Sequence, residues 1–240
     1  MTISFPLAMP TDVIGISEIE LRAENAVGIT QSPFTFRQQV FRYPGQRWTA
    51  SVSIAPVNRE FGEPWVAFLL ALNGPAGTFL LGDPLGACPR GAAKNYQTAV
   101  TGNLLLEDGD ILLKEDGDNL LYEQGAVTSL QVDGAGQTGQ DIDLEGAPSS
   151  VTDYLLPGDY VQFGAGATAT LHKVLLAAST DTFGKLTVTL WPSPRTSPID
   201  SSTVPLLNTV GRFRLASNQQ AWTIANNLRY GVSFEAVEAI

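Results

Sequence analysis

The residues best suited to chemistry lie in an acidic repeat near the middle of the chain. Residues 103–123 read NLLLEDGDILLKEDGDNLLYE, and Glu-Asp-Gly-Asp recurs with a period of eight. Closely spaced carboxylates are typical calcium ligands. An EF-hand loop, however, needs oxygen ligands at alternate positions over roughly twelve residues, and here Ile111, Leu112 and Leu113 occupy that interval. We therefore expect no designed metal site in the repeat, and weak adventitious cation binding stays open.

Turn chemistry accounts for the same acidic residues. Asp-Gly pairs between alternating segments are a strong hairpin signal, because a type I′ turn needs positive φ at both central positions. The sequence thus predicts hairpin turns at Asp108 and Gly109 and again at Asp116 and Gly117. These turns would join a three-stranded meander made of residues 104–107, 110–115 and 118–123.

The sequence offers few other groups for catalysis. Cys88 is the only cysteine and His172 the only histidine, so neither an intrachain disulfide nor a cysteine-based metal cluster can form. His172 lies in TLHKVLL, and we expect a hydrogen-bonded or exposed strand residue rather than a general base. Phosphate-loop, zincin and nucleophile-elbow motifs are missing from the sequence. A pair of distant carboxylates for glycoside hydrolysis stays open. We expect no enzyme, no cofactor and no metal.

The net charge of −10 comes from one part of the chain. Residues 103–145 contain eleven acids and a single base, Lys114, whereas both flanks are neutral. Such a shift indicates a separate module on a neutral scaffold. Arg37, Arg42 and Arg47 recur at intervals of five, but a neutral flank provides no basic field for nucleic acid. Because arginine is enriched at protein interfaces, these three are candidate interface residues. No apolar run approaches the roughly 20 residues of a membrane helix, so we expect no membrane insertion.

Apolar and polar residues alternate with the period of a strand along most of the chain, which predicts a mainly β protein. One segment instead follows the helix period, with Trp65, Phe68, Leu69 and Leu72 on one stripe. We predict a helix over about residues 64–73, with this stripe facing the core. The predicted strands are residues 14–22, 38–43, 48–54, 78–81, 159–163, 168–176, 186–190, 212–215 and 230–234.

Several pieces of the flanks resemble a known family in their order along the chain. They are FPLAMPTDVIG, SPFTFRQQVFRYPGQRW, GTFLLGDP, LPGDYVQFG, GRFRLAS and YGVSFEAVE. The sequence resembles the distal tail protein (Dit) family of long-tailed (siphovirus-type) bacteriophages and gene transfer agents. The resemblance covers most of the chain in outline and rests on structural motifs, not on a catalytic signature.

The resemblance implies a β-sandwich belt domain with one α-helix, which assembles as a hexameric ring at the end of the tail tube. We assign the belt to residues 1–94 and 209–240. Residues 95–208 would form an inserted acidic β domain, with the hairpins and a small β-barrel. The commonest family pattern instead places the extra domain after the belt, so this chain departs from it.

The expected function is a structural adaptor of the virion tail tip, assembled in the cytoplasm of the bacterial host. It would join the tail tube protein to the baseplate hub and fibre proteins, and Arg37, Arg42 and Arg47 are the candidate ring contacts. The alternative is a glycan-binding β module for host adsorption, with Tyr122, Tyr154 or Trp191 stacking on host-surface glycan. Burial in strands is the favoured explanation of those three aromatics. A hydrolase on a β-sandwich ranks third.

Overall fold

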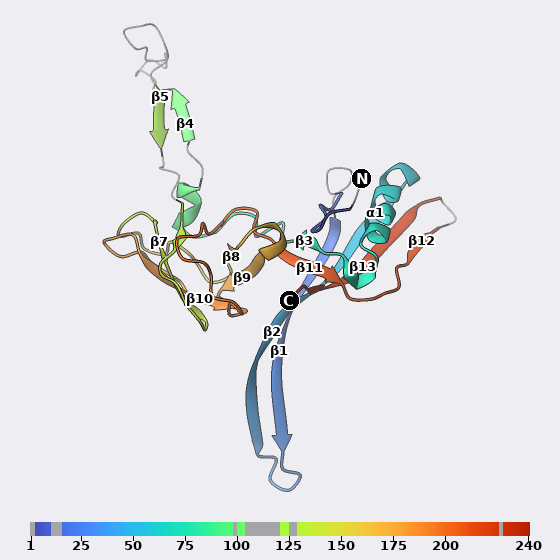
Figure 1. The fold of residues 1–240 in the computed structure, drawn as a ribbon, viewed down its shortest axis with the longest axis horizontal. Helices are drawn as coiled ribbons and strands as arrows, with labels where there is room; N and C mark the ends of the chain where they lie inside the picture. The colour runs from blue at the N-terminus through green and yellow to red at the C-terminus, as the bar shows by residue number, and fades with distance from the viewer. Residues whose placement is uncertain (1–2, 11–15, 98–99, 104–120, 125–128, 226–227) are drawn as a thin grey trace.

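The computed structural model describes residues 3–10, 16–97, 100–103, 121–124, 129–225 and 228–240, and in this part the protein is mainly β, as predicted. The strands form two main sheets and a separate two-stranded ribbon, and one α-helix accompanies them within these residues. Figure 1 shows the two main sheets side by side along the long axis, with two ribbons projecting from the body in opposite directions.

The first sheet has six strands in the order β1-β2-β13-β11-β3, with β12 pairing with β13 beside this path. Its strands are β1 (Ile16–Gln31), β2 (Gln38–Val57), β3 (Phe79–Leu81), β11 (Gly211–Leu215), β12 (Trp222–Ile224) and β13 (Tyr230–Glu238). The alternation in β2 places Trp48, Val52 and Ile54 in the core and Ser51 and Ser53 on the outer face. The predicted period of two therefore sets the buried side of this sheet.

The second sheet has five strands in the order β6-β7-β10-β9-β8. Its strands are β6 (Gln131–Val132), β7 (Asp141–Glu145), β8 (Tyr160–Phe163), β9 (Thr170–Val174) and β10 (Leu186–Trp191), and the separate ribbon pairs β4 (Val100–Asn103) with β5 (Leu121–Gln124). Ile142 and Leu144 of β7 pack with Leu186 and Val188 of β10 in a second core. Acids occupy the outward positions of β7, which explains how an acidic segment forms a strand.

The helix α1 (Arg59–Ala71) begins earlier than predicted, and Pro64 lies inside it rather than in its first turn. Asn58 stands at the cap position, and its carbonyl accepts hydrogen bonds from the N–H groups of Phe61 and Gly62. The Asn58 side chain makes no capping hydrogen bond, so the backbone carbonyl of Asn58 alone closes the first turn. The helix thus begins five residues before the predicted start of the range 64–73.

The apolar stripe of α1 faces the core, as predicted. Trp65 and Phe68 are buried, and their rings lie 5.9 Å apart in an edge-on contact. Phe68 also contacts Phe79 of β3 and Phe234 of β13, with ring centroids 5.6 and 6.4 Å away. The helix therefore covers the inner face of the first sheet with aromatic side chains.

The two sheets share part of one core. Tyr160 of β8 and Leu171 of β9 belong to the cluster under the first sheet, and Trp48 of β2 donates its indole N–H to the carbonyl of Leu171 at 2.9 Å. Most other apolar residues of the second sheet form their own cluster. The division into residues 1–94 with 209–240 and residues 95–208 stays a prediction, and the two parts are in intimate contact.

Candidate interaction surface

The strands β1 and β2 continue beyond the first sheet as a two-stranded ribbon. β13 pairs with β2 only from Val57 to Thr49, whereas β1 follows β2 as far as the pair of Gln31 with Gln38. We call residues 25–46, which form the outer part of this ribbon and its loop, the arm. The arm leaves the body near its middle and points away from both sheets (Figure 1).

The arm exposes apolar side chains on both of its faces. Cross-strand partners lie on the same face, so Ile29 and Val40 form an aliphatic row. Phe41 and Tyr43 lie on the opposite face beside Gly28, where a Cβ would stand 3.4 Å from the Tyr43 ring. The exposed apolar residues of the arm are Val27, Ile29, Phe34, Phe36, Val40, Phe41 and Tyr43. Exposed apolar patches of this kind mark interaction sites.

The tip of the arm holds an aromatic residue in an unfavourable backbone conformation. The Ser32 N–H donates to the Arg37 carbonyl at 2.9 Å, and the Phe36 N–H donates to the Ser32 carbonyl at 3.0 Å. This turn places Phe36 at φ 55°, while its side chain remains 74% exposed and that of Phe34 91% exposed. A bulky residue in this region costs on the order of 1 kcal/mol or more, and such strain clusters at functional sites.

A bulge connects the arm to the sheet and corrects a sequence prediction. Residues 38–43 and 48–54 are parts of one strand, β2, and not separate strands. The register changes between the pairs Asn25 with Gln46 and Val27 with Arg42, so Tyr43, Pro44 and Gly45 stand opposite a single residue of β1. Pro44 has no N–H to donate, and a bulge is one of the few places in a ladder that accept this.

Polar contacts fix the base of the arm to the loop that follows β10. The Trp191 indole N–H donates to Asn25 Oδ1 at 2.8 Å, and the Ser193 N–H donates to Gln46 Oε1 at 2.9 Å. Arg195 donates to the Gln46 carbonyl and, at 3.2 Å for each pair of atoms, to both carboxylate oxygens of buried Glu238. We call these six residues the base clamp; it sets the direction of the arm relative to both sheets.

His172 lies beside the base clamp and is buried and hydrogen-bonded. Its Nδ1 lies 2.6 Å from the Pro192 carbonyl, which can only accept, so Nδ1 carries the proton and Nε2 accepts from the Thr170 hydroxyl at 2.9 Å. Burial lowers the pKa of His172 to about 4, and the charge of Arg195 acts in the same direction. The ring is therefore neutral at pH 7, and both its nitrogens are engaged in structural bonds.

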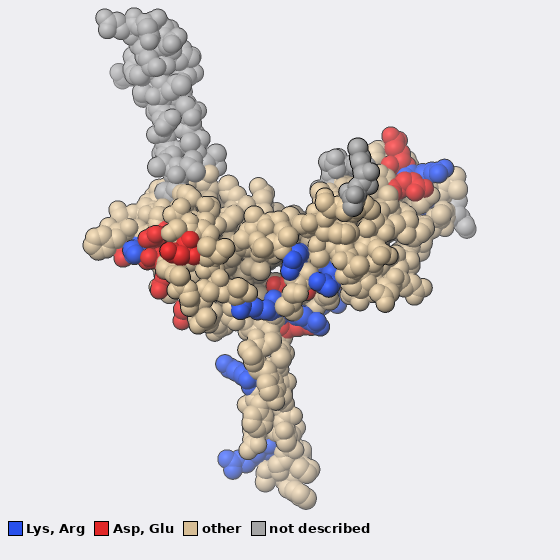
Figure 2. All heavy atoms as spheres, viewed as in Figure 1, with Lys and Arg blue, Asp and Glu red and all other residues tan. Residues whose placement is uncertain are grey.

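The three candidate arginines all lie on β2 or just before it. Arg47 pairs with Glu24 at 2.6 Å near the base of the arm, and both side chains are about half exposed. Arg37 at the tip and Arg42 on the strand are exposed, and neither has an acidic partner among the described residues. Residues 25–46 contain no acid, and the visible face of the outer arm in Figure 2 is accordingly basic or uncharged.

The acidic repeat lies largely outside the described residues. Asp108, Gly109, Asp116 and Gly117 all fall there, so the predicted turns stay predictions. The strands on either side of this segment are described, and β4 pairs with β5 in an antiparallel register that joins Asn103 to Leu121. The two ends of the repeat are therefore held together on the ribbon that projects opposite the arm (Figure 1).

The aromatics considered for glycan stacking are engaged in the body where the structure describes them. Tyr154 is fully buried. The Trp191 ring meets Trp48 edge-on at 4.6 Å, and its N–H is bound to Asn25. The side chain of Tyr122 is outside the described part. Burial thus explains Tyr154, and packing at the arm base explains Trp191.

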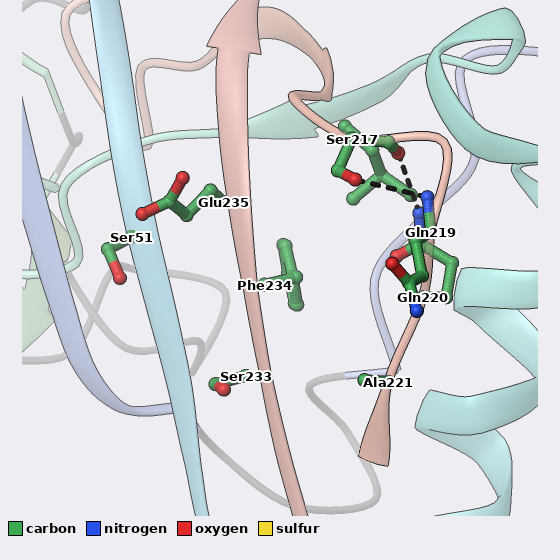
Figure 3. Close-up of a pocket in the computed structure, with 9 residues that line it drawn as sticks. Ser51, Ser217, Gln219, Gln220, Ala221, Ser233, Phe234 and Glu235 are labelled. Carbon is green, nitrogen blue, oxygen red and sulfur yellow. Dashed lines mark hydrogen bonds between the residues drawn. The ribbon is translucent and has the colours of Figure 1, made fainter.

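The two best-formed hollows of the described surface are shallow and polar. The first, of about 280 Å³, is lined by Ser51, Ser217, Gln219, Gln220 and Glu235 among others. Figure 3 shows the Gln219 backbone N–H bonded to the Ser217 hydroxyl and the Gln220 side-chain amide bonded to the Ser217 carbonyl. Glu235 is the only titratable group in its lining. A single carboxylate without a second acid, base or nucleophile does not form a catalytic set.

The second hollow, of about 430 Å³, lies on the acidic face of the second sheet. Its carboxylates already have partners: Asp133 pairs with Lys185 at 2.5 Å, and Asp143 accepts from the Thr187 hydroxyl at 2.6 Å. The Lys185 backbone N–H donates to Asp181 and lowers the pKa of that carboxyl. Within the described residues no group of three or more histidine, cysteine or acidic side chains could hold a metal.

Comparison with models of known protein families gives no match, and a search of curated proteins finds no significant relative. The described helix is also too short to cross a membrane. The arm carries seven of the exposed large apolar side chains of the described residues, which makes it the candidate interaction surface.

Proposed function

We propose that the protein is a structural, ring-forming adaptor of a phage tail tip, which joins the tail tube to the hub and fibre proteins. The sequence resemblance suggests which assembly the protein belongs to. The exposed apolar arm supports its association with further copies. The role is structural, and no step of chemistry, cofactor or metal is part of the proposal.

The arm carries the proposal because it gives the isolated chain little stability. Its exposed aliphatic and aromatic side chains contact no core, and its tip holds Phe36 in a strained conformation. Aromatic residues and arginine are the types that dominate binding energy at protein interfaces, and the arm contains Phe34, Phe41, Tyr43 and Arg42 in addition. A surface of this composition is stabilised when a second molecule covers it.

The direction of the arm also supports assembly. The base clamp joins Asn25 and Gln46 to the loop after β10, so the arm is presented at a defined angle and not as a loose extension. A fixed arm loses less conformational entropy on binding than a mobile one would. Repeated contacts between identical rigid subunits can therefore close into a ring.

The test is the mass of the native particle. Sedimentation equilibrium and native mass spectrometry of the full chain should show a closed oligomer, a hexamer by the family resemblance. Replacing residues 27–44 by a two-residue turn should give a folded monomer, because the base clamp and both cores remain. Leu85→Ser, at an exposed apolar site elsewhere, is the matched control and should leave the oligomer intact. A wild-type chain that stays monomeric at high concentration would defeat the proposal.

A further inference from the structure

One face of the arm is aliphatic and carries a single charge. Val27 pairs with Arg42 and Ile29 with Val40, and alternate pairs along a ladder lie on the same face. The three aliphatic side chains are 45 to 63% exposed, and Arg42 is exposed beside them. Arg42 forms no ion pair within the described residues. We call these four residues the aliphatic face.

The end of the first sheet where α1 and β12 lie has an apolar patch that the helix leaves uncovered. Trp222 pairs with Val232 and Ile224 with Tyr230, so both β12 side chains lie on the inner face of the sheet. On that face α1 packs over β13, where Gly62 stands directly against Tyr230. β12 lies beside this contact, and Trp222 remains 38% and Ile224 60% exposed.

Phe61 of α1 borders the same patch. It precedes Phe68 by seven residues, or about two helical turns, so both lie on one side of the helix. Phe68 contacts Phe79 of β3, and β3 lies on the side of β13 that β12 also occupies, because β2 takes the other edge. Phe61 is therefore on the β12 side of α1, and it is 38% exposed. Figure 1 shows α1 beside the hairpin of β12 and β13.

Glu60 supplies the charge of this patch. Its side chain is exposed in the first turn of α1 and forms no ion pair within the described residues. The other charges at this end are engaged, since Glu63 pairs with Arg59 at 3.2 Å and Arg229 donates to the Pro56 carbonyl at 3.3 Å. We call the following four residues the flank patch: Glu60, Phe61, Trp222 and Ile224.

We propose that the flank patch of one copy receives the aliphatic face of the arm of the next copy. The inference rests on the proposed ring and names the two surfaces that meet in it. Contact between them would remove apolar side chains of both copies from water. Arg42 would meet Glu60, a complementary pair that fixes the register of the contact. The two surfaces differ, so the interface is heterologous, as a closed ring of identical subunits requires.

The charges favour the flank patch over a second arm as the partner. Residues 25–46 contain no acid, so an arm placed against another arm would offer Arg42 no acidic group. The flank patch offers one beside aromatic and aliphatic side chains, the composition that the aliphatic face matches.

A charge exchange between the two surfaces tests the contact. Arg42→Glu and Glu60→Arg should each raise the dissociation constant of the oligomer about tenfold, and the double variant should return it to within about threefold of wild type. Glu18→Arg is the matched control, because Glu18 is an exposed acid paired with Ser53 on the outer face of the first sheet. Combined with Arg42→Glu, it should restore nothing. Sedimentation velocity over a concentration series at one salt concentration measures all these variants.

The apolar part of the contact is tested by Ile224→Ser. Because Ile224 is already 60% exposed in the single chain, its circular dichroism and urea unfolding should stay close to wild type. The oligomer should nevertheless dissociate at about tenfold higher concentration. Leu176→Ser, at a site that is 62% exposed just after β9, is the matched control and should leave the oligomer intact.

The outcomes separate this contact from the ring itself. A ring in which the double charge variant assembles no better than Arg42→Glu, or in which Ile224→Ser changes nothing, would overturn the contact and leave the ring proposal standing. The flank patch would then face a different protein. A wild-type chain that stays monomeric at high concentration would remove both proposals.

Discussion

At the scale of single residues, His172 and Phe36 differ in burial and in their effect on the stability of the single chain. His172 is neutral and enclosed, and both ring nitrogens are satisfied by Pro192 and Thr170. Phe36 is strained and exposed. The first contributes to the stability of the single chain, whereas the second costs stability unless a partner covers it. Two measurements follow from this contrast.

The stability contributed by neutral His172 should be lost in mild acid. Its pKa in the folded chain is about 4, below the ordinary value of 6.5, so the unfolded chain takes up the proton first as pH falls. The contribution is complete above pH 6.5 and is lost as pH falls toward 4, which amounts to about 3 kcal/mol of unfolding free energy. Urea unfolding at pH 7 and pH 4 measures it. His172→Gln should lose less between the same two values, since all other groups titrate in both chains; an equal loss would contradict the assignment.

The Phe36 side chain should matter for assembly and little for folding. Phe36→Gly removes the strain at φ 55° and also adds freedom to the unfolded chain, and these effects oppose each other. The unfolding free energy should change by less than about 1 kcal/mol. The oligomer should nevertheless dissociate at a higher protein concentration than wild type in sedimentation velocity runs. A large loss of stability would show that the tip belongs to the fold.

At the scale of elements, α1 and the arm differ in what their aromatic residues contact. Phe68 packs on Trp65, Phe79 and Phe234 in the core, whereas no core lies under the aromatic row of the arm. The helix is therefore the element whose truncation should reduce the stability of the monomer.

Phe68→Ala should lower the unfolding free energy by roughly 3 to 5 kcal/mol, as for other buried aromatic truncations. Leu70 lies on the same helix but is more than half exposed, so Leu70→Ala is the matched control and should cost less than about 1 kcal/mol. Denaturant unfolding of both variants at pH 7 makes the comparison. Equal stabilities would place the stripe at an interface and not in the core.

The sequence predicts elements best where one face is buried. Alternation indicated the central part of β2, β10 and β13, because Val52, Val188 and Phe234 recur with polar neighbours between them. It missed β7, where only Ile142 and Leu144 alternate with acids. It also missed the outer part of β1, whose residues are exposed on both faces and therefore leave no period to read.

The candidate interaction surface was likewise predictable from the sequence only in part. The spacing of Arg37, Arg42 and Arg47 suggested an interface, but nothing local showed that all three belong to one projecting ribbon. That fact depends on the register of β1 with β2 and on the bulge at Pro44, which are contacts between distant residues. The base clamp was equally hidden, since Gln46 and Arg195 are far apart in the chain.

At the scale of the whole molecule, the basic and the acidic surfaces lie on different parts of the protein. The arm is basic, and the acidic face of the second sheet lies away from it on the body (Figure 2). An interface made through the arm, as proposed, would avoid repulsion between the acidic faces of adjacent subunits.

Charge reversal on the arm should weaken the ring. Arg42→Glu replaces an exposed arginine of the arm by an acid and should raise the dissociation constant about tenfold, or about 1.4 kcal/mol, because arginine is favoured at protein interfaces. Lys94→Glu changes the net charge equally at an exposed site away from the arm and is the matched control. Sedimentation at low and high salt measures both. A ring unaffected by Arg42→Glu would place the contact elsewhere.

The base clamp fixes the orientation of the arm relative to the body. Trp191, Ser193 and Arg195 hold its root through side chains and backbone at once, and the same loop continues directly from β10 of the second sheet. The arm cannot tilt against that sheet without breaking these bonds. A load on the tip of the arm is therefore carried into the second sheet as well as into the first, because bonds from both sheets hold its root.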